Sequence, residues 1–172
     1  MKTTEELIDI LGGTSLFGQL AEDDLRDLLE RCRHRTHISG EALWAAGEPG
    51  DAAYILVEGR LETTWRVQPD GQRSRQAARP GAMLGLAYLV HDWAHESSAY
   101  PLEKSEVLEL RRTDFQELFE QGHPAAYRLT DALADELVDE VRDANRRMHE
   151  VFGHPADTLR TLRRRARSSE RR

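Results

Sequence analysis

The sequence predicts a mainly β domain with flanking helices, followed by one long helix. Eight short segments that are apolar or alternate in polarity follow one another between residues 35 and 110, and turn residues separate them. This spacing is typical of a sandwich or barrel. After Leu110 the hydrophobic period changes from two to about 3.6, and Ala125 to Phe152 contains no helix breaker.

Two short helices are expected before the strands. Glu5 to Leu11 has a helical pattern that ends at Gly12-Gly13, and Ala21 to Cys32 repeats leucines at spacings of three and four. Cys32 falls on this leucine stripe, which predicts a small buried hydrophobe and not a reactive thiol. It is the single cysteine of the chain, so an internal disulfide is excluded.

The strands follow in regular order, and Pro69-Asp70-Gly71 predicts a hairpin turn among them. Thr113 with Gln116 three residues later predicts a capping box at the start of the next helix. The expected strands are Arg35 to Ile38, Ala42 to Ala45, Ala53 to Val57, Arg60 to Val67, Arg73 to Ala78, Met83 to Leu86, Ser97 to Leu102 and Glu106 to Leu110.

The long helix carries a narrow apolar seam with a heptad period, and charged residues occupy its other faces. Such a seam favours a parallel homodimeric coiled coil. The alternative is that the stripe packs on the chain's own barrel, but that interface typically needs a broader apolar face. The seam residues are Ala134, Leu137, Val141, Ala144, Met148 and Val151.

A turn and strand block runs from Ala46 to Leu61, where Gly47, Pro49 and Gly50 mark a turn before the apolar run Tyr54 to Val57. This block resembles the cyclic nucleotide-binding domain family. The resemblance covers about Leu16 to Phe152 and implies a double-stranded β-helix, or jelly roll, followed by a dimer helix. It divides the chain into an extension (1–15), the binding-like domain (16–122), the dimerisation helix (123–153) and a tail (154–172).

The segment from Arg79 to Ala87 resembles the family's phosphate-binding cassette, yet the ligand residues differ. In the family, a glutamate contacts the ribose, and an arginine followed by a serine or threonine contacts the cyclic phosphate. Ungapped alignment puts Leu86, His95 and Glu96 at these positions, and a register shift of one puts Glu96 and Ser97 at the last two. A phosphate needs a cation to replace its lost water. We therefore expect a degenerate pocket formed by Met83, Leu84, Gly85, Leu86, Ala87, His95, Glu96, Ser97 and Ser98.

Other candidate sites are weaker. Arg75 and Arg79, four residues apart, are candidate phosphate contacts, although exposed arginines are the commoner case. His91 and His95 with Asp92 and Glu96 suggest zinc, but capping of a pocket rim is the favoured interpretation and no metal is expected. No catalytic motif occurs in the sequence, so we predict a protein that is not an enzyme and has no obligatory cofactor.

The charge of the chain is divided between an acidic body and a basic tail. Residues 1–159 carry 17 basic and 30 acidic residues, a net −13, whereas the last 13 residues carry a net +6. The tail predicts weak binding to polyanions without sequence preference, or else only a solubilising segment. Its basic residues are Arg160, Arg163, Arg164, Arg165, Arg167, Arg171 and Arg172.

The resemblance also extends to transcription regulators that carry a winged helix-turn-helix after the dimer helix. Only 19 residues follow Gly153, so sequence-specific DNA binding is not expected. The sequence contains no apolar run of membrane-spanning length, which predicts a cytoplasmic protein. The leading hypothesis is a homodimeric regulatory or scaffold module that binds a partner protein. The alternatives are a receptor for a cyclic mononucleotide or cyclic di-GMP, and a nonspecific nucleic-acid binder.

Overall fold

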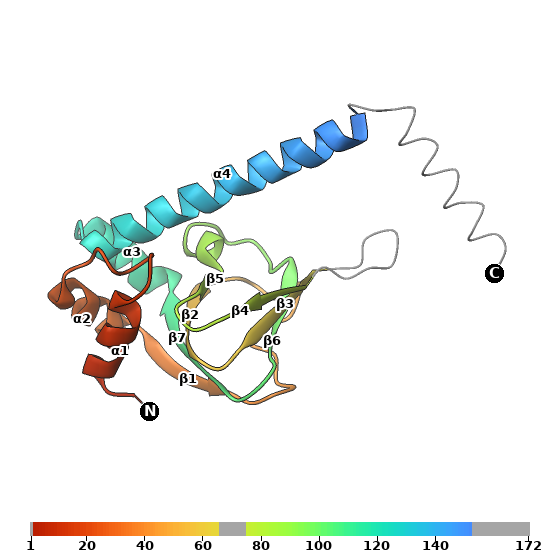
Figure 1. The fold of residues 1–172 in the computed structure, drawn as a ribbon. Helices are drawn as coiled ribbons and strands as arrows, with labels where there is room; N and C mark the ends of the chain where they lie inside the picture. The colour runs from red at the N-terminus through yellow and green to blue at the C-terminus, as the bar shows by residue number, and fades with distance from the viewer. Residues whose placement is uncertain (1, 66–74, 153–172) are drawn as a thin grey trace. The chain divides into compact units, whose positions relative to one another are not determined.

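The computed structural model describes residues 2–65 and 75–152. Their helices and strands confirm the predicted fold class (Figure 1). The elements in chain order are α1 Thr4–Gly12, α2 Glu22–Arg31, β1 Arg33–His37, β2 Ala52–Glu58, β3 Leu61–Trp65, β4 Arg75–Ala78, β5 Met83–Leu84, the 3₁₀ helix η1 Leu86–Leu89, β6 Ser97–Pro101, β7 Ser105–Arg111, α3 Arg112–Glu120 and α4 Pro124–Phe152.

The strands form two antiparallel sheets that give a jelly roll. The first sheet has the order β1-β7-β2-β5, and the second has the order β4-β3-β6. Leu56 and Val107 of the first sheet pack with Leu61 and Ala78 of the second in one buried cluster. Because side chains alternate between the two faces of a strand, Glu106 and Leu108 project to the opposite face of the first sheet from Val107.

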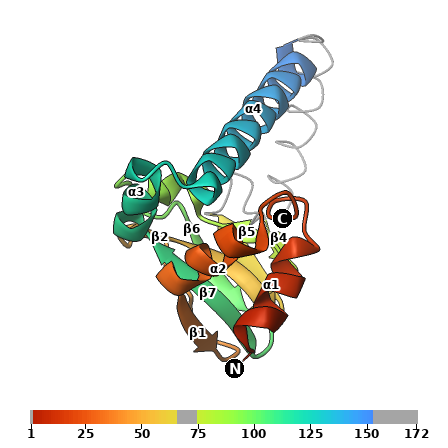
Figure 2. The same ribbon diagram turned by 90° about the vertical axis from the view of Figure 1, so that its left-hand side faces the viewer.

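Helices α1 and α2 lie against that opposite face, in front of β1 and β7 in Figure 2. Leu7 and Leu11 of α1 and Leu25 and Leu28 of α2 are buried. Helix α1 begins with a capping box, in which Glu6 N–H donates to the Thr3 hydroxyl and Thr3 N–H donates to the Glu6 carboxylate. Local capping and packing therefore both fix this helix.

Two local predictions were wrong. Ala42 to Ala45 is not a strand, because only Trp44 bridges Ala99 there and Ala46 N–H donates instead to the Ser98 hydroxyl. The Thr113 capping box does not form, because β7 runs directly into α3 and the helix already begins at Arg112. Cys32 lies just beyond α2, in an extended conformation, and is half-buried. Desolvation raises the pKa of its thiol to about 12, in agreement with the prediction that Cys32 is not a reactive thiol.

The helix predicted from Ala125 to Phe152 is confirmed as α4. The chain divides into two units at Asp131, so the second unit begins with Ala132 inside this helix. The predicted hairpin turn at 69–71 lies outside the described residues. Within those residues, no helix combines the length and the apolar character needed to cross a membrane.

Candidate functional site

The cassette begins where β5 leaves the first sheet. Leu84 pairs with Tyr54 of β2, and Gly85 then adopts a φ of 79°, in the left-handed region that favours glycine. A Cβ on Gly85 would lie 3.2 Å from the Tyr88 ring and 3.3 Å from the Ala52 carbonyl oxygen. Glycine therefore lets the chain turn tightly into η1 and bring Tyr88 against β2.

A continuous aromatic stack lies beneath the cassette. The ring centroids of Tyr54 and Trp44 are 5.3 Å apart, those of Trp44 and His95 are 4.8 Å apart, and those of His95 and Tyr88 are 4.1 Å apart. The Trp44 indole also donates to the Ser97 carbonyl at 2.9 Å. Such packing is directional as well as apolar. It places the histidine between two aromatic rings.

The predicted glycine turn holds the cassette loop in place. Gly47 N–H donates to the His95 carbonyl and His95 N–H donates to the Glu48 carbonyl, both at 2.8 Å. Gly50 N–H donates to the Trp93 carbonyl at 3.0 Å. A Cβ on Gly50 would lie 2.2 Å from the Tyr88 ring. The absence of a side chain at Gly50 is thus what allows Tyr88 to complete the stack.

His95 is only 5% exposed. Burial lowers the pKa of its imidazole, and the nearby carboxylates of Glu48 and Asp51 oppose this effect. Its Nδ1 atom has no hydrogen-bond partner in the described part of the chain. The environment therefore favours a neutral ring at the position where the family resemblance implies a cationic phosphate ligand.

The remaining cassette residues divide between the interior and the surface. Leu86 and Ser97 are buried, while Glu96 is exposed, so its carboxylate projects away from the stack. The partly buried cassette residues are Met83, Leu84, Gly85, Ala87 and Ser98. Arg79 is exposed, and Arg75 pairs through its backbone with Thr64. The candidate ribose position thus carries a buried leucine, and the candidate phosphate positions carry a buried histidine and an exposed carboxylate.

The sequence model of the cyclic nucleotide-binding domain matches residues 35–122, just over half of the chain. The chain belongs to the cyclic nucleotide-binding domain family. The curated protein "Cyclic AMP receptor protein" of Thermus thermophilus is 28% identical over 126 residues, which make up 73% of this chain and 58% of that protein. This chain thus spans little more than half the length of that relative.

Solved structures of this family have the same fold. The N-terminal domain of a transcriptional regulator from Streptomyces coelicolor A3(2) has a TM-score of 0.66 and 26% identity, covering 79% of this chain and 94% of that chain. The catabolite activator protein of Thermus thermophilus has a TM-score of 0.71 and 25% identity, covering 80% of this chain and 64% of that chain.

Sequence reasoning missed Arg112, the first residue of α3. Its Nε donates to the Tyr88 carbonyl at 2.8 Å, and its Nη2 donates to the carbonyls of Gly50 and His91. The Arg112 N–H also donates to the Asp51 carbonyl at 2.8 Å. One guanidinium thus joins the glycine turn, η1 and the cassette loop of this family member to α3. The sequence indicated this role only through the pair Arg111-Arg112 at the end of β7.

The zinc hypothesis for the cassette loop receives no geometric support. His91 stacks on Trp93 with centroids 4.2 Å apart and ring planes 5° apart, whereas His95 lies in the buried stack. Within the described residues, no group of three or more histidine, cysteine or acidic side chains is arranged to hold a metal ion. The predicted capping of a pocket rim is wrong for His95, which is buried between Trp44 and Tyr88, whereas Trp93 is exposed and stacks on His91.

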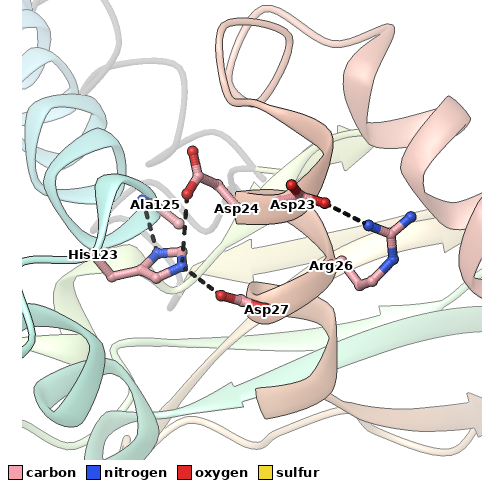
Figure 3. Close-up of polar contacts among 6 residues, drawn as sticks. All are labelled: Asp23, Asp24, Arg26, Asp27, His123 and Ala125. Carbon is pink, nitrogen blue, oxygen red and sulfur yellow. Dashed lines mark hydrogen bonds and ion pairs between the residues drawn. The ribbon is translucent and has the colours of Figure 1, made fainter.

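His123 marks the start of α4 and faces α2 (Figure 3). Its Nδ1 accepts a hydrogen bond from Ala125 N–H at 3.2 Å. Its Nε2 lies 4.0 Å from a carboxylate oxygen of Asp24 and 3.7 Å from one of Asp27. Because Nδ1 is an acceptor, the proton of the neutral ring is assigned to Nε2. The histidine therefore caps the first turn of α4 and directs its own donor toward α2.

The described part of the second unit is the rest of α4, where most of the predicted seam residues are exposed. Leu137, Val141 and Met148 are 50%, 60% and 55% exposed. Ala134 and Ala144 are exposed as well, and Val151 belongs to the same helix. Ion pairs between Arg142 and Asp139 and between Arg146 and Asp143 occupy other faces. The basic residues from Arg160 to Arg172 lie outside the described residues.

Proposed function

We propose that this chain is a non-catalytic regulatory module of the cyclic nucleotide-binding domain family. Its nucleotide pocket is degenerate, it forms a homodimer through α4, and it acts by binding a partner protein. The observation that carries this proposal is His95, which is held between Trp44 and Tyr88 where a nucleotide phosphate would require a cation.

Charge is the first argument against a cyclic nucleotide. A bound phosphodiester exchanges its water for protein donors, and the strong donors are cationic. No arginine or lysine occurs between Gly81 and Glu103, and burial favours the neutral form of His95. Leu86, which is buried, offers no acceptor to a ribose hydroxyl. Both polar ends of the nucleotide would therefore lose hydration without gaining partners.

The aromatic stack is the second argument against a cyclic nucleotide. Each offset or tilted aromatic pair contributes about 0.5–1.5 kcal/mol beyond its buried area, and the Tyr54-Trp44-His95-Tyr88 stack contains three such pairs. Arg112 also binds the backbone carbonyls of Tyr88 and His91. A nucleotide that entered this stack would have to separate these aromatic pairs. This supports a constitutively organised domain that serves as a structural platform.

The dimer part of the proposal rests on α4. A helix with a narrow apolar seam and charged flanks buries that seam most simply against a parallel copy of itself. The exposure of Leu137, Val141 and Met148 fits this arrangement. A partner protein then provides the regulatory output, since neither a ligand nor a reaction is expected here.

Isothermal titration calorimetry of the full chain with cyclic AMP, cyclic GMP and cyclic di-GMP tests the proposal. Loss of a charge-assisted phosphate contact costs about 1.5–3 kcal/mol. With the ribose contact also lost, we expect no saturable heat below about 1 mM ligand. A dissociation constant below about 10 μM for either mononucleotide would identify a receptor. Tight binding of cyclic di-GMP would identify a receptor for a cyclic dinucleotide.

A gain-of-binding variant sharpens the same experiment. Leu86→Glu with His95→Arg and Glu96→Ser supplies the family's ribose and phosphate contacts, and we expect it to bind cyclic AMP measurably. The matched control introduces the same residue types into the exposed part of the loop, as Val90→Glu with His91→Arg and Asp92→Ser. Equal binding by both variants would show that the contacts at these positions do not determine affinity.

A further inference from the structure

The loop from Val90 to Glu96, between η1 and β6, presents an exposed tryptophan. Trp93 is 58% exposed, and Val90, three residues earlier, is 43% exposed. The Trp93 indole stacks on His91 with ring planes 5° apart. This stack covers one face of the indole, while the residue as a whole stays more than half exposed. Tryptophan is enriched among the residues that contribute most to protein interfaces.

The backbone on both sides of this tryptophan is held by contacts to the rest of the domain. Gly50 N–H donates to the Trp93 carbonyl at 3.0 Å, and Ala94 forms a β-bridge with Pro49. The Arg112 guanidinium donates to the carbonyl of His91. A side chain on a backbone that is already fixed loses less conformational freedom when it binds. Trp93 is therefore a preorganised anchor.

The surroundings of Trp93 are acidic. Asp92 and Glu96 belong to the same loop, and Glu48 and Asp51 belong to the glycine turn that pairs with it. All four are exposed, and none forms an ion pair within residues 2–65 and 75–152. Neither segment contains an arginine or a lysine. An exposed surface of this charge attracts cationic groups.

The cations next to these two segments are already engaged. The Arg112 guanidinium donates to three backbone carbonyls. Arg111 is close enough to Asp51 for their charges to interact, but its guanidinium is paired with Glu109 at 3.0 Å. The surface formed by Val90, Asp92, Trp93 and Glu96, here called the Trp93 surface, thus combines an aromatic anchor with carboxylates that lack cationic partners in the described part of the chain.

We propose that the Trp93 surface binds an arginine-bearing segment of a partner protein. This inference rests on the proposed function and deepens it, because it names the surface and the chemistry of the partner. A planar guanidinium stacks on an indole face and at the same time donates N–H groups to nearby carboxylates. A lysine ammonium is a point charge that cannot stack in this way. The surface therefore favours arginine over lysine.

The indole N–H signal of Trp93 in NMR spectra of the full chain tests this surface, and Trp93→Phe identifies the signal among the three tryptophans. The probe is an eight-residue peptide of alternating arginine and glycine, with lysine and glutamate counterparts. We expect a saturable shift with the arginine peptide, at an affinity at least about threefold above that of the lysine peptide, and none with the glutamate peptide. Equal affinity for arginine and lysine, or shifts that do not saturate, would overturn the proposal.

Variants with matched controls separate this surface from nonspecific attraction to an acidic protein, with calorimetry of the arginine peptide as the readout. Trp93→Ala should weaken binding at least about threefold, whereas Tyr127→Ala, at a residue that is 51% exposed on α4, should not. Asp92→Asn with Glu96→Gln should weaken it about twofold to tenfold. Its control is Glu22→Gln with Glu120→Gln, which removes the same charge from exposed positions of α2 and α3. Equal losses in a variant and its control would overturn the proposal.

The outcome is distinguishable from that of the nucleotide titration. If the arginine peptide does not bind, this surface is not the partner site, but the degenerate pocket is unaffected. Micromolar cyclic AMP binding contradicts the proposed function whatever the peptide does. A Trp93 indole signal that moves with protein concentration before any peptide is added would show that another copy of the chain covers this surface, and would overturn the inference.

Discussion

The cassette region and the part of α4 beyond Leu133 differ in the burial of their apolar side chains. Around the cassette, Trp44 and His95 are buried in a stack, and neighbouring backbone groups hold the loop. From Ala132 onward, Leu137 and Val141 remain largely exposed. The first region buries its aromatic side chains against one another, whereas the second leaves apolar side chains exposed on the described part of α4. This contrast suggests that the chain's interactions depend on the helix more than on the family's ligand pocket.

The largest effect is expected at the stack. Trp44→Ala removes a buried ring and its hydrogen bond to Ser97, and should lower the free energy of unfolding by about 3–5 kcal/mol, measured by urea denaturation. The matched control is Trp93→Ala, because Trp93 is 58% exposed and stacks only on His91. We expect a change of less than about 1 kcal/mol for this control. Similar losses for both tryptophans would show that the stack is not a structural element.

The next effect concerns the seam. Leu137→Asp with Val141→Asp places two charges in the proposed dimer interface and should weaken dimerisation by at least about 100-fold while the β-rich circular dichroism is retained. Sedimentation of the full chain measures this change. Arg146→Asp, on a charged face of the same helix, serves as the control and should leave the dimer intact. A wild-type chain that is monomeric at tens of micromolar would contradict the dimer proposal.

The smallest effect is the pH dependence that His95 contributes. Burial lowers the pKa of His95 in the folded state, so the unfolded chain binds its proton at a higher pH. The free energy of unfolding therefore carries no penalty from His95 above about pH 6.5, and it decreases as the pH falls below that value. His95→Gln should flatten the dependence of unfolding free energy between about pH 7 and pH 5. His91→Gln is the exposed control, and an equal flattening there would assign the effect to another cause.

Local patterns in the sequence were sufficient for most of the fold. The glycine turn at 47–50, the apolar run of β2 and the unbroken helix α4 each depend on neighbouring residues, so their signals are local. The cassette glycine Gly85 was identified through the family resemblance, and its left-handed φ of 79° gives the physical reason for glycine at this position. The α3 capping box failed because β7 enters the helix directly, and propensity cannot reveal that connection.

The sequence by itself determined the mainly β class, the long helix and the absence of arginine and lysine between Gly81 and Glu103, and the family resemblance supplied the jelly roll. Only the tertiary structure decided that His95 stacks between Trp44 and Tyr88, and that Arg112 joins three backbone segments. The physical reason is sequence separation. These contacts join residues that are often dozens of positions apart, and burial and partner choice at each depend on how the sheets and helices pack.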